Sequence, residues 1–343
     1  MLNEVMPYSI KYDNELINGS MFLFNAQSNE KKLPYMLFVP EDMKDNSSLV
    51  VGNFTTGSSN MNYNDTISAL IDIVKKGQNI EVLLKKLCYE QRCPILFPII
   101  PRFNGFYSTF LTSDVYKNVF DRLDMHKKNG RVHIDESDKD YLRNIPKQVY
   151  DMINNSKNFI NNSLKGQVQD KVIMTGYSAA GHFVNAFSVL YPEVVSMVIA
   201  GGTDGILTLP YKEYNRQLLP VPIGVGDVDN FNIEEFKKIK YFVYMGSRDI
   251  GDCALLNKNK EAVSRECFSD EQARIINQMF GNCSTQERLE QVVDIYKYMG
   301  INIDMRTYNT DHFGIVSPNI ATLVANHVYD FVSRNMEYVS KTM

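Results

Sequence analysis

One stretch of twelve residues, 171–182, constrains the fold of this chain more than any other. It runs Lys-Val-Ile-Met-Thr-Gly-Tyr-Ser-Ala-Ala-Gly-His and places a serine at position 178. Its apolar, β-branched first half predicts a buried strand, and the residues from Ala179 onward predict a helix. A serine at the tight turn between such a strand and helix is typical of a nucleophile elbow, where small neighbours let the backbone fold back. The stretch therefore predicts an accessible Ser178 Oγ beside helix N–H groups that can bind an oxyanion.

The motif departs from the usual G-x-S-x-G pattern at one position. Ala180 stands where the second glycine is expected, and Gly181 follows one residue later. Alanine is small enough for many such turns, so the pattern favours an elbow over an ordinary strand, loop and helix with an incidental serine. The elbow hypothesis then depends on suitable partners elsewhere in the chain.

Short apolar runs alternate with amphipathic segments along the rest of the chain. Strands are expected at 21–24, 33–40, 49–54, 94–101, 171–175, 194–200, 239–245 and 301–308. Helical spacing of apolar residues separates most of the later runs, for example over 144–164, 179–190 and 320–331. This alternation predicts the α/β class, with a mostly parallel, doubly wound sheet of about eight strands and helices on both faces.

The length of the chain, 343 residues, suits one large domain with an insertion. We expect a single domain over 1–343. The segment 203–236 is rich in Pro, Gly, Tyr and Asn and lies between two predicted core strands. It is therefore expected to form an irregular cap or pocket wall within that domain.

Charge and hydropathy disfavour several classes of partner. The 36 Lys and Arg residues are dispersed and balanced by 40 Asp and Glu, which argues against nucleic-acid binding. No apolar stretch is long enough for a signal peptide or a membrane span, so a cytoplasmic protein is expected. The five cysteines match no zinc or disulfide spacing, which predicts free thiols and neither a metal nor another cofactor. The expected partner is a small-molecule acyl substrate, and the oligomeric state stays open.

Acyl transfer by a serine requires a base for the Oγ proton and a carboxylate that orients this base. Ser178, Asp249 and His312 each follow a predicted strand. In mostly parallel sheets, ligands lie at the carboxyl ends of the strands. The fold would therefore bring these three side chains to the same edge of the sheet.

Other residues compete for the roles of base and acid. His182 lies one turn after the serine in the same predicted helix, and His327 lies on the apolar face of the closing helix. His312 is favoured because it lies in a loop that follows a strand. Asp249 directly ends its strand, and Asp252, three residues later, stays open as an alternative acid.

The order Ser178, Asp249, His312, together with the elbow, resembles the α/β-hydrolase fold family. The similarity spans roughly Pro34 to the C-terminus and is greatest to the bacterial esterase and polyester-depolymerase-like branch. It implies the α/β-hydrolase fold, with Ser178 as nucleophile, His312 as base and Asp249 as acid. It also implies an oxyanion hole formed by the backbone N–H of Ala179 and one from Thr56 or Gly57.

Three further residues are candidates for substrate contacts. Tyr177 adjoins the serine, and Arg102 lies on the same predicted edge, where it would bind an anionic substrate or form a structural salt bridge. Asp204 follows a predicted strand and would line the pocket or cap the next segment. The resemblance implies a serine hydrolase that cleaves a carboxylic ester through an acyl-enzyme. The alternatives are a thioesterase, amidase or acyltransferase with the same triad, or a non-catalytic binding protein.

Overall fold

A computed structural model gives the fold of the chain. It describes residues 2–25, 32–52, 58–59, 63–77, 80–100, 102–103, 141, 144–252, 254–256, 268, 270–281 and 283–340. The chain divides into two compact units. The first comprises Met1–Asn104, Ser113–Met174 and Thr322–Asp330, and the second comprises Gly105–Thr112, Thr175–Ala321 and Phe331–Met343. The single domain expected over 1–343 stays a prediction.

The first unit contains the antiparallel part of the sheet. Its strands are β1 (Leu2–Tyr12), β2 (Glu15–Phe24), β3 (Tyr35–Pro40), β6 (Ile95–Pro98), β4 (Val50–Val51) and the start of β8 (Val172–Tyr177), in this spatial order. The pairs β1–β2, β2–β3 and β3–β6 are antiparallel, whereas β4 is parallel to both β6 and β8. A separate short parallel pair joins β5 (Ser58–Ser59) to β7 (Arg102–Phe103).

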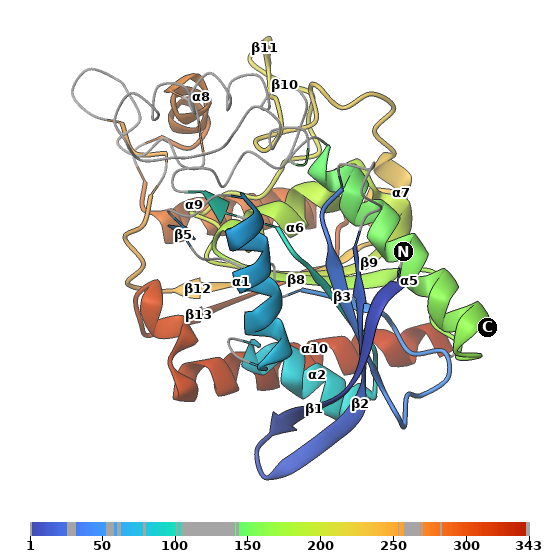
Figure 1. The fold of residues 1–343 in the computed structure, drawn as a ribbon. Coiled ribbons are helices and arrows are strands. Elements are labelled where there is room, and N and C mark those ends of the chain that lie inside the picture. The colour runs from blue at the N-terminus through green and yellow to red at the C-terminus, as the bar shows by residue number, and fades with distance from the viewer. Residues whose placement is uncertain are drawn as a thin grey trace. The chain divides into compact units, whose positions relative to one another are not determined.

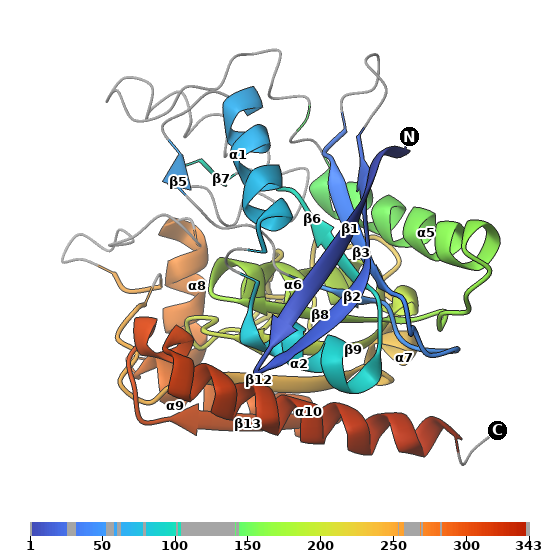
Figure 2. The ribbon, with the colours of Figure 1, turned by 60° about the horizontal axis from the view of Figure 1, so that its bottom comes forward.

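Helices flank this part of the sheet. They are α1 (Tyr63–Lys75), α2 (Val82–Gln91) and α5 (Ile145–Ser163). The α2 helix lies beside β1, and α5 lies beside β6 (Figure 2). The α5 helix buries apolar residues along one side, including Val149, Ile153 and Ile160, as the sequence predicts for an amphipathic helix.

The second unit contains the parallel strands at the other end of the sheet order. The end of β8 is followed in space by β9 (Val195–Gly201), β12 (Lys240–Gly246) and β13 (Ile303–Tyr308). The pairs β9–β12 and β12–β13 are parallel. The α6 helix (Ala179–Leu190) lies beside β9, and α9 (Thr285–Tyr298) lies beside β13 (Figure 1). Because α6 is buried on nearly all sides, it is apolar around most of its circumference.

The remaining elements of the second unit are short or connect strands. They are η3 (Pro192–Val194), β10 (Glu213–Tyr214), β11 (Gln217–Leu218), α7 (Ile233–Lys237), α8 (Asp270–Phe280) and η4 (Phe313–Val316). The α10 helix (Pro318–Ser340) contributes residues to both units. The segment 203–236 contains the β10–β11 hairpin and all of α7 except its last residue, and it buries Leu207, Leu219 and Ile223. Its role as a cap stays a prediction.

With β8 shared between the units, the sheet has nine strands and is mostly parallel. This architecture confirms the predicted α/β class. The strand beyond the expected eight is β1, which pairs with β2 over its whole length. Most of its side chains are exposed, so this strand lacks the buried apolar run by which the other strands were predicted.

Candidate active site

Ser178 occupies the sharp turn between β8 and α6, as the sequence predicts. The strand ends at Tyr177 and the helix begins at Ala179, so one residue makes the turn. Its backbone has φ 58° and ψ −124°, a combination that costs free energy for any residue with a side chain. The Ser178 N–H donates to Gly201 O at 2.8 Å, and the Ser178 carbonyl accepts from His182 N at 3.1 Å. These bonds hold the strained turn between β9 and the first turn of α6.

His312 reaches Ser178 from the loop after β13. His312 Nε2 lies 3.0 Å from Ser178 Oγ, and Nδ1 lies 2.7 Å from Asp249 Oδ2. When Nδ1 carries the proton, it donates a hydrogen bond to the Asp249 carboxylate. Nε2 is then left as the acceptor for the serine hydroxyl. The three side chains therefore form one continuous chain of hydrogen bonds within the second unit.

Asp249 is buried at the carboxyl end of β12. Its Oδ1 accepts the Gly251 N–H at 2.9 Å, and its carbonyl accepts the hydroxyl of Thr285, also at 2.9 Å. Its own N–H donates to Gly246 O at 3.1 Å. One carboxylate oxygen is thus held by the backbone while the other faces His312.

Aromatic rings pack around His312. Tyr177 donates its hydroxyl to His312 O at 2.6 Å, and its ring stacks on Tyr244 and lies 5.0 Å from the imidazole. Two glycines make room for these rings. A Cβ on Gly201 would lie 2.3 Å from the Tyr244 ring, and one on Gly202, whose φ is +60°, would lie 3.0 Å from His312 Cε1. Any larger residue at either position would push the rings away.

Carboxylates around the imidazole set its protonation. The hydrogen bond to Asp249 raises the pKa of His312, the charges of Asp249, Asp204 and Asp311 act in the same direction, and burial opposes them. Burial, followed by the charges of the same three aspartates, raises the pKa of Tyr177, so this hydroxyl stays a neutral donor. The site therefore favours a positive charge on His312.

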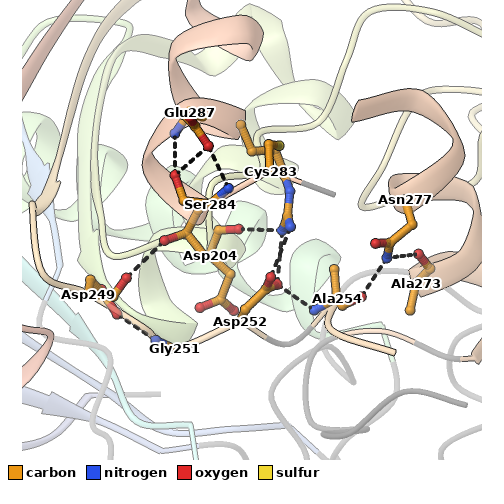
Figure 3. A network of polar contacts seen from close by, with 12 residues as sticks. Asp204, Asp249, Gly251, Asp252, Ala254, Ala273, Asn277, Cys283, Ser284 and Glu287 are labelled. Atoms are coloured by element: carbon orange, nitrogen blue, oxygen red, sulfur yellow. Dashed lines mark hydrogen bonds and ion pairs between the residues drawn. The ribbon is translucent and has the colours of Figure 1, made fainter. Parts of the chain in front are cut away.

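The alternative acid, Asp252, has a different partner. Its carboxylate accepts two bonds from Arg288, Nη1 to Oδ1 and Nη2 to Oδ2, each 2.9 Å long (Figure 3). Of the two aspartates that the sequence left open, Asp249 is the one in contact with His312.

The alternative base, His182, pairs with Asp204. His182 Nε2 lies 3.2 Å from Asp204 Oδ2, and the ring meets Phe268 edge-on. Asp204, a candidate for substrate contact, has its side chain in this pair and its carbonyl bonded by Arg288. His327, the other competing histidine, lies on α10 in the first unit.

The remaining predicted residues have different outcomes. Ala179 is the first residue of α6, where a helix leaves backbone N–H groups without intrahelical partners. Arg102 lies in β7, opposite Ser58 of β5 in the first unit. Thr56 and Gly57, expected to contribute the second oxyanion donor, lie outside the described residues.

Apolar side chains lie exposed next to both partners of the serine. Ile250, which follows Asp249, is 93% exposed, and Phe313, which follows His312, is 83% exposed. The Phe313 ring meets the imidazole edge-on with centroids 5.6 Å apart.

The sequence did not predict a role for two residues next to the site, Thr285 and Arg288. Both are buried on α9 and bond the segment that carries Asp249. One signal could have found the arginine. Its helical neighbours Leu289, Val292 and Tyr296 are apolar and buried, so Arg288 is a charged residue on an apolar helix face. Such a residue requires an acidic partner.

The described part of the chain holds no group of three or more His, Cys, Asp or Glu arranged to hold a metal ion. Among the same residues, no helix combines the length and apolarity that crossing a membrane requires.

Comparisons with known proteins returned only structural similarities. No family model matches the chain, and no curated protein matches its sequence. A thermostable esterase has 14% identity and a TM-score of 0.41 over 97% of this chain, which spans 62% of the length of that esterase. An S-formylglutathione hydrolase from Agrobacterium tumefaciens has 12% identity and a TM-score of 0.41, with 94% and 97% of the two chains covered. The fluorophosphonate-binding serine hydrolase FphF of Staphylococcus aureus has 9% identity and a TM-score of 0.37, with 90% and 98% covered.

Proposed function

We propose that this protein is a serine hydrolase of the α/β-hydrolase type that cleaves carboxylic esters of small molecules through an acyl-enzyme. Ser178 is the nucleophile, His312 the base and Asp249 the residue that orients the base. One observation carries the proposal: the continuous chain of hydrogen bonds from Ser178 Oγ through His312 to Asp249, with lengths of 3.0 and 2.7 Å. The 3.0 Å between Ser178 Oγ and His312 Nε2 lies within the range for proton transfer from a nucleophile to its base, and the 2.7 Å bond from Nδ1 to Asp249 orients that base.

The first half of the reaction forms the acyl-enzyme. Ser178 Oγ attacks the ester carbonyl carbon while its proton passes to His312 Nε2. The resulting imidazolium is stabilised by the Asp249 carboxylate at Nδ1. Collapse of the tetrahedral intermediate breaks the bond to the alcohol oxygen, which leaves with the proton from Nε2.

Water completes the cycle. It attacks the acyl carbon as His312 takes one of its protons, and the acid leaves as Ser178 Oγ recovers that proton. The N–H of Ala179 donates to the oxyanion in both halves, and Thr56 or Gly57 contributes the second donor.

Replacement of the nucleophile tests the proposal. Ser178→Ala should lower kcat for short p-nitrophenyl esters by about 10⁴-fold or more, because only binding and the oxyanion donors remain. Ser9→Ala, which removes an exposed hydroxyl in the first unit, is the matched control and should keep full activity. A fluorophosphonate probe should label wild type at Ser178 and leave the alanine variant unlabelled. Turnover retained in a folded Ser178→Ala variant would overturn the assignment.

The bond type is tested separately. Matched ester, thioester and amide substrates with one acyl group, each assayed with and without an alcohol acceptor, should give the highest kcat/KM for the ester in water. A higher value for the thioester or amide, or product formed mainly on the acceptor, would assign the same triad to that reaction instead.

A further inference from the structure

Two side chains of α9 fasten the segment that carries Asp249. At one end, the Thr285 hydroxyl donates to the carbonyl of Asp249 at 2.9 Å. At the other end, Arg288 makes its bidentate contact with Asp252, three residues further along (Figure 3). Both side chains start from the first turn of the helix, so one rigid element sets the two ends of the segment.

The same arginine also fastens the loop after β9. Its Nη1 donates to the carbonyl of Asp204 at 3.1 Å, and the Asp204 side chain pairs with His182 on α6. Arg288 is only 2% exposed, so its charge depends on these carboxylate and carbonyl partners. The bidentate geometry fixes the direction of the contact as well as its length, which a lysine could not do.

The start of α9 is itself held in place. Ser284 and Glu287 form a reciprocal capping box, in which each side chain bonds the backbone N–H of the other residue. Gly205 packs against the same turn so closely that a Cβ there would lie 2.3 Å from Thr285 O. The first turn of α9 therefore has little freedom to shift relative to the loop that carries Asp249 or the loop that carries Asp204.

We propose that Thr285 and Arg288 are positioning residues, which hold the Asp249 carboxylate at Nδ1 of His312. Neither residue contacts His312, so each acts through the segment between its two anchor points. The description of Asp249 as the catalytic acid rests on the proposed function. The contact between Asp249 and His312, which the two residues maintain, is independent of it.

The protonation of His312 reports on this contact. The charged groups whose fields act on the imidazole are Asp249 after β12, Asp204 after β9 and Asp311 next to it in sequence, while Tyr177 stays neutral. The hydrogen bond to Asp249 is the largest of the effects that raise the pKa of His312. Displacement of Asp249 should therefore lower this pKa, whereas a purely structural loss would reduce the folded fraction and leave the pKa of the folded form unchanged.

The experiment compares Thr285→Val with Thr285→Ser and Arg288→Lys with Arg334→Lys. Thr285→Ser is the control for Thr285→Val, because serine keeps the hydroxyl that valine lacks. Arg334→Lys is the control for Arg288→Lys, because Arg334 forms an exposed ion pair with Asp304. NMR titration of the imidazole C–H signals follows His312 without turnover, with His312→Gln identifying its resonance. Ester hydrolysis is measured on the same samples.

In Thr285→Val and Arg288→Lys we expect His312 to titrate at a lower pH than in wild type, with kcat about tenfold lower and KM unchanged. Thr285→Ser and Arg334→Lys should behave as wild type. If Arg288→Lys does not fold, the comparison of Thr285→Val with Thr285→Ser alone tests the positioning role. Titration of His312 at the wild-type pH in folded Thr285→Val would overturn the positioning role. A wild type that hydrolyses no ester yet shows the shift in its variants would instead overturn the proposed function.

Discussion

A Cβ placed on Gly176 would lie 2.9 Å from the Cβ of Ala180 and 2.4 Å from the carbonyl carbon and oxygen of that alanine. Gly176 belongs to β8, and Ala180 is buried in the first turn of α6. The turn at Ser178 therefore brings strand and helix so close together that residue 176 has no room for a side chain. The alanine that departs from the usual motif is accommodated because its neighbour across the turn is glycine.

This contact predicts the effect of Gly176→Ala. The added methyl group should destabilise the protein by about 1–3 kcal/mol, because the crowded atoms include backbone that cannot rotate away. Ala180→Gly is the control and should cost about 1 kcal/mol or less, the loss of helix propensity. Since the carbonyl of residue 180 stays in place, the double variant should not regain the stability lost by Gly176→Ala. Urea denaturation measures all three, and wild-type stability of Gly176→Ala would contradict the prediction.

The strained backbone of Ser178 predicts a stability gain when function is removed. Its φ of 58° with ψ of −124° costs about 1–3 kcal/mol for a residue with a Cβ. Ser178→Gly relieves this strain, whereas Ser178→Ala keeps it. Glycine costs about 0.5–1 kcal/mol of stability because of its greater freedom in the unfolded chain. The unfolding free energy of Ser178→Gly should therefore exceed that of Ser178→Ala by about 1 kcal/mol. Parallel denaturation curves compare them, and a less stable glycine variant would refute the strain argument.

Tyr177 supports the histidine loop through its hydroxyl. Tyr177→Phe removes the 2.6 Å bond to His312 O and should cost about 0.5–1.5 kcal/mol of stability. Because the imidazole loses a tether, kcat for ester hydrolysis should fall more than KM rises. Tyr298→Phe removes a hydroxyl from a side chain that is 90% exposed and should change neither quantity. Steady-state kinetics on both variants checks this, and an effect on KM alone would indicate substrate contact instead.

The rate of ester hydrolysis should depend on the protonation of His312. Only the neutral imidazole accepts the Ser178 proton, so kcat/KM should fall as the pH drops through the pKa of His312. Because the bond to Asp249 raises this pKa, the fall should lie above about pH 6.5, the value for an unperturbed histidine. Asp249→Asn should move the fall to lower pH and reduce kcat by about 10⁴-fold. A pH–rate profile of wild type and variant measures both effects.

The contact between His312 and Asp249 also contributes to the stability of the fold, and it does so at low pH, where the activity should fall. A pKa raised in the folded state means that the fold favours the charged imidazole, so this contribution is fully present below about pH 6.5. It is lost as the pH rises through the raised pKa of His312. The difference in unfolding free energy between wild type and His312→Gln should therefore shrink from acidic to alkaline pH. A difference that grows over this range would contradict the sign of the pKa shift.

Local signals made much of this fold predictable. The β-branched run of β8 and the small residues that follow it predict the turn at Ser178, and the alternation of apolar runs predicts the mostly parallel sheet. By contrast, β1 is an exposed edge strand whose polar residues carry no such pattern. Its pairing with β2 depends on a neighbour in space and not on its own composition.

The arrangement of the site was predictable only where chain order determines it. Asp249 and Asp252 lie three residues apart after the same strand, so their positions in the sequence favour Asp249 without excluding Asp252. In the structure, Arg288 distinguishes the two aspartates, because it binds the Asp252 carboxylate from a helix later in the chain and leaves Asp249 to contact His312. The roles of Ser178 and His312 stay a proposal, supported by their distance.

The two exposed apolar side chains and the two glycines have opposite consequences for redesign. Gly201 and Gly202 each lie against a ring of the site, so every substitution there should displace Tyr177, Tyr244 or His312. Ile250 and Phe313 are exposed to solvent one residue away from Asp249 and His312. A mutagenesis library confined to these two positions would test whether they set the substrate preference of the proposed hydrolase, while leaving the folding core untouched.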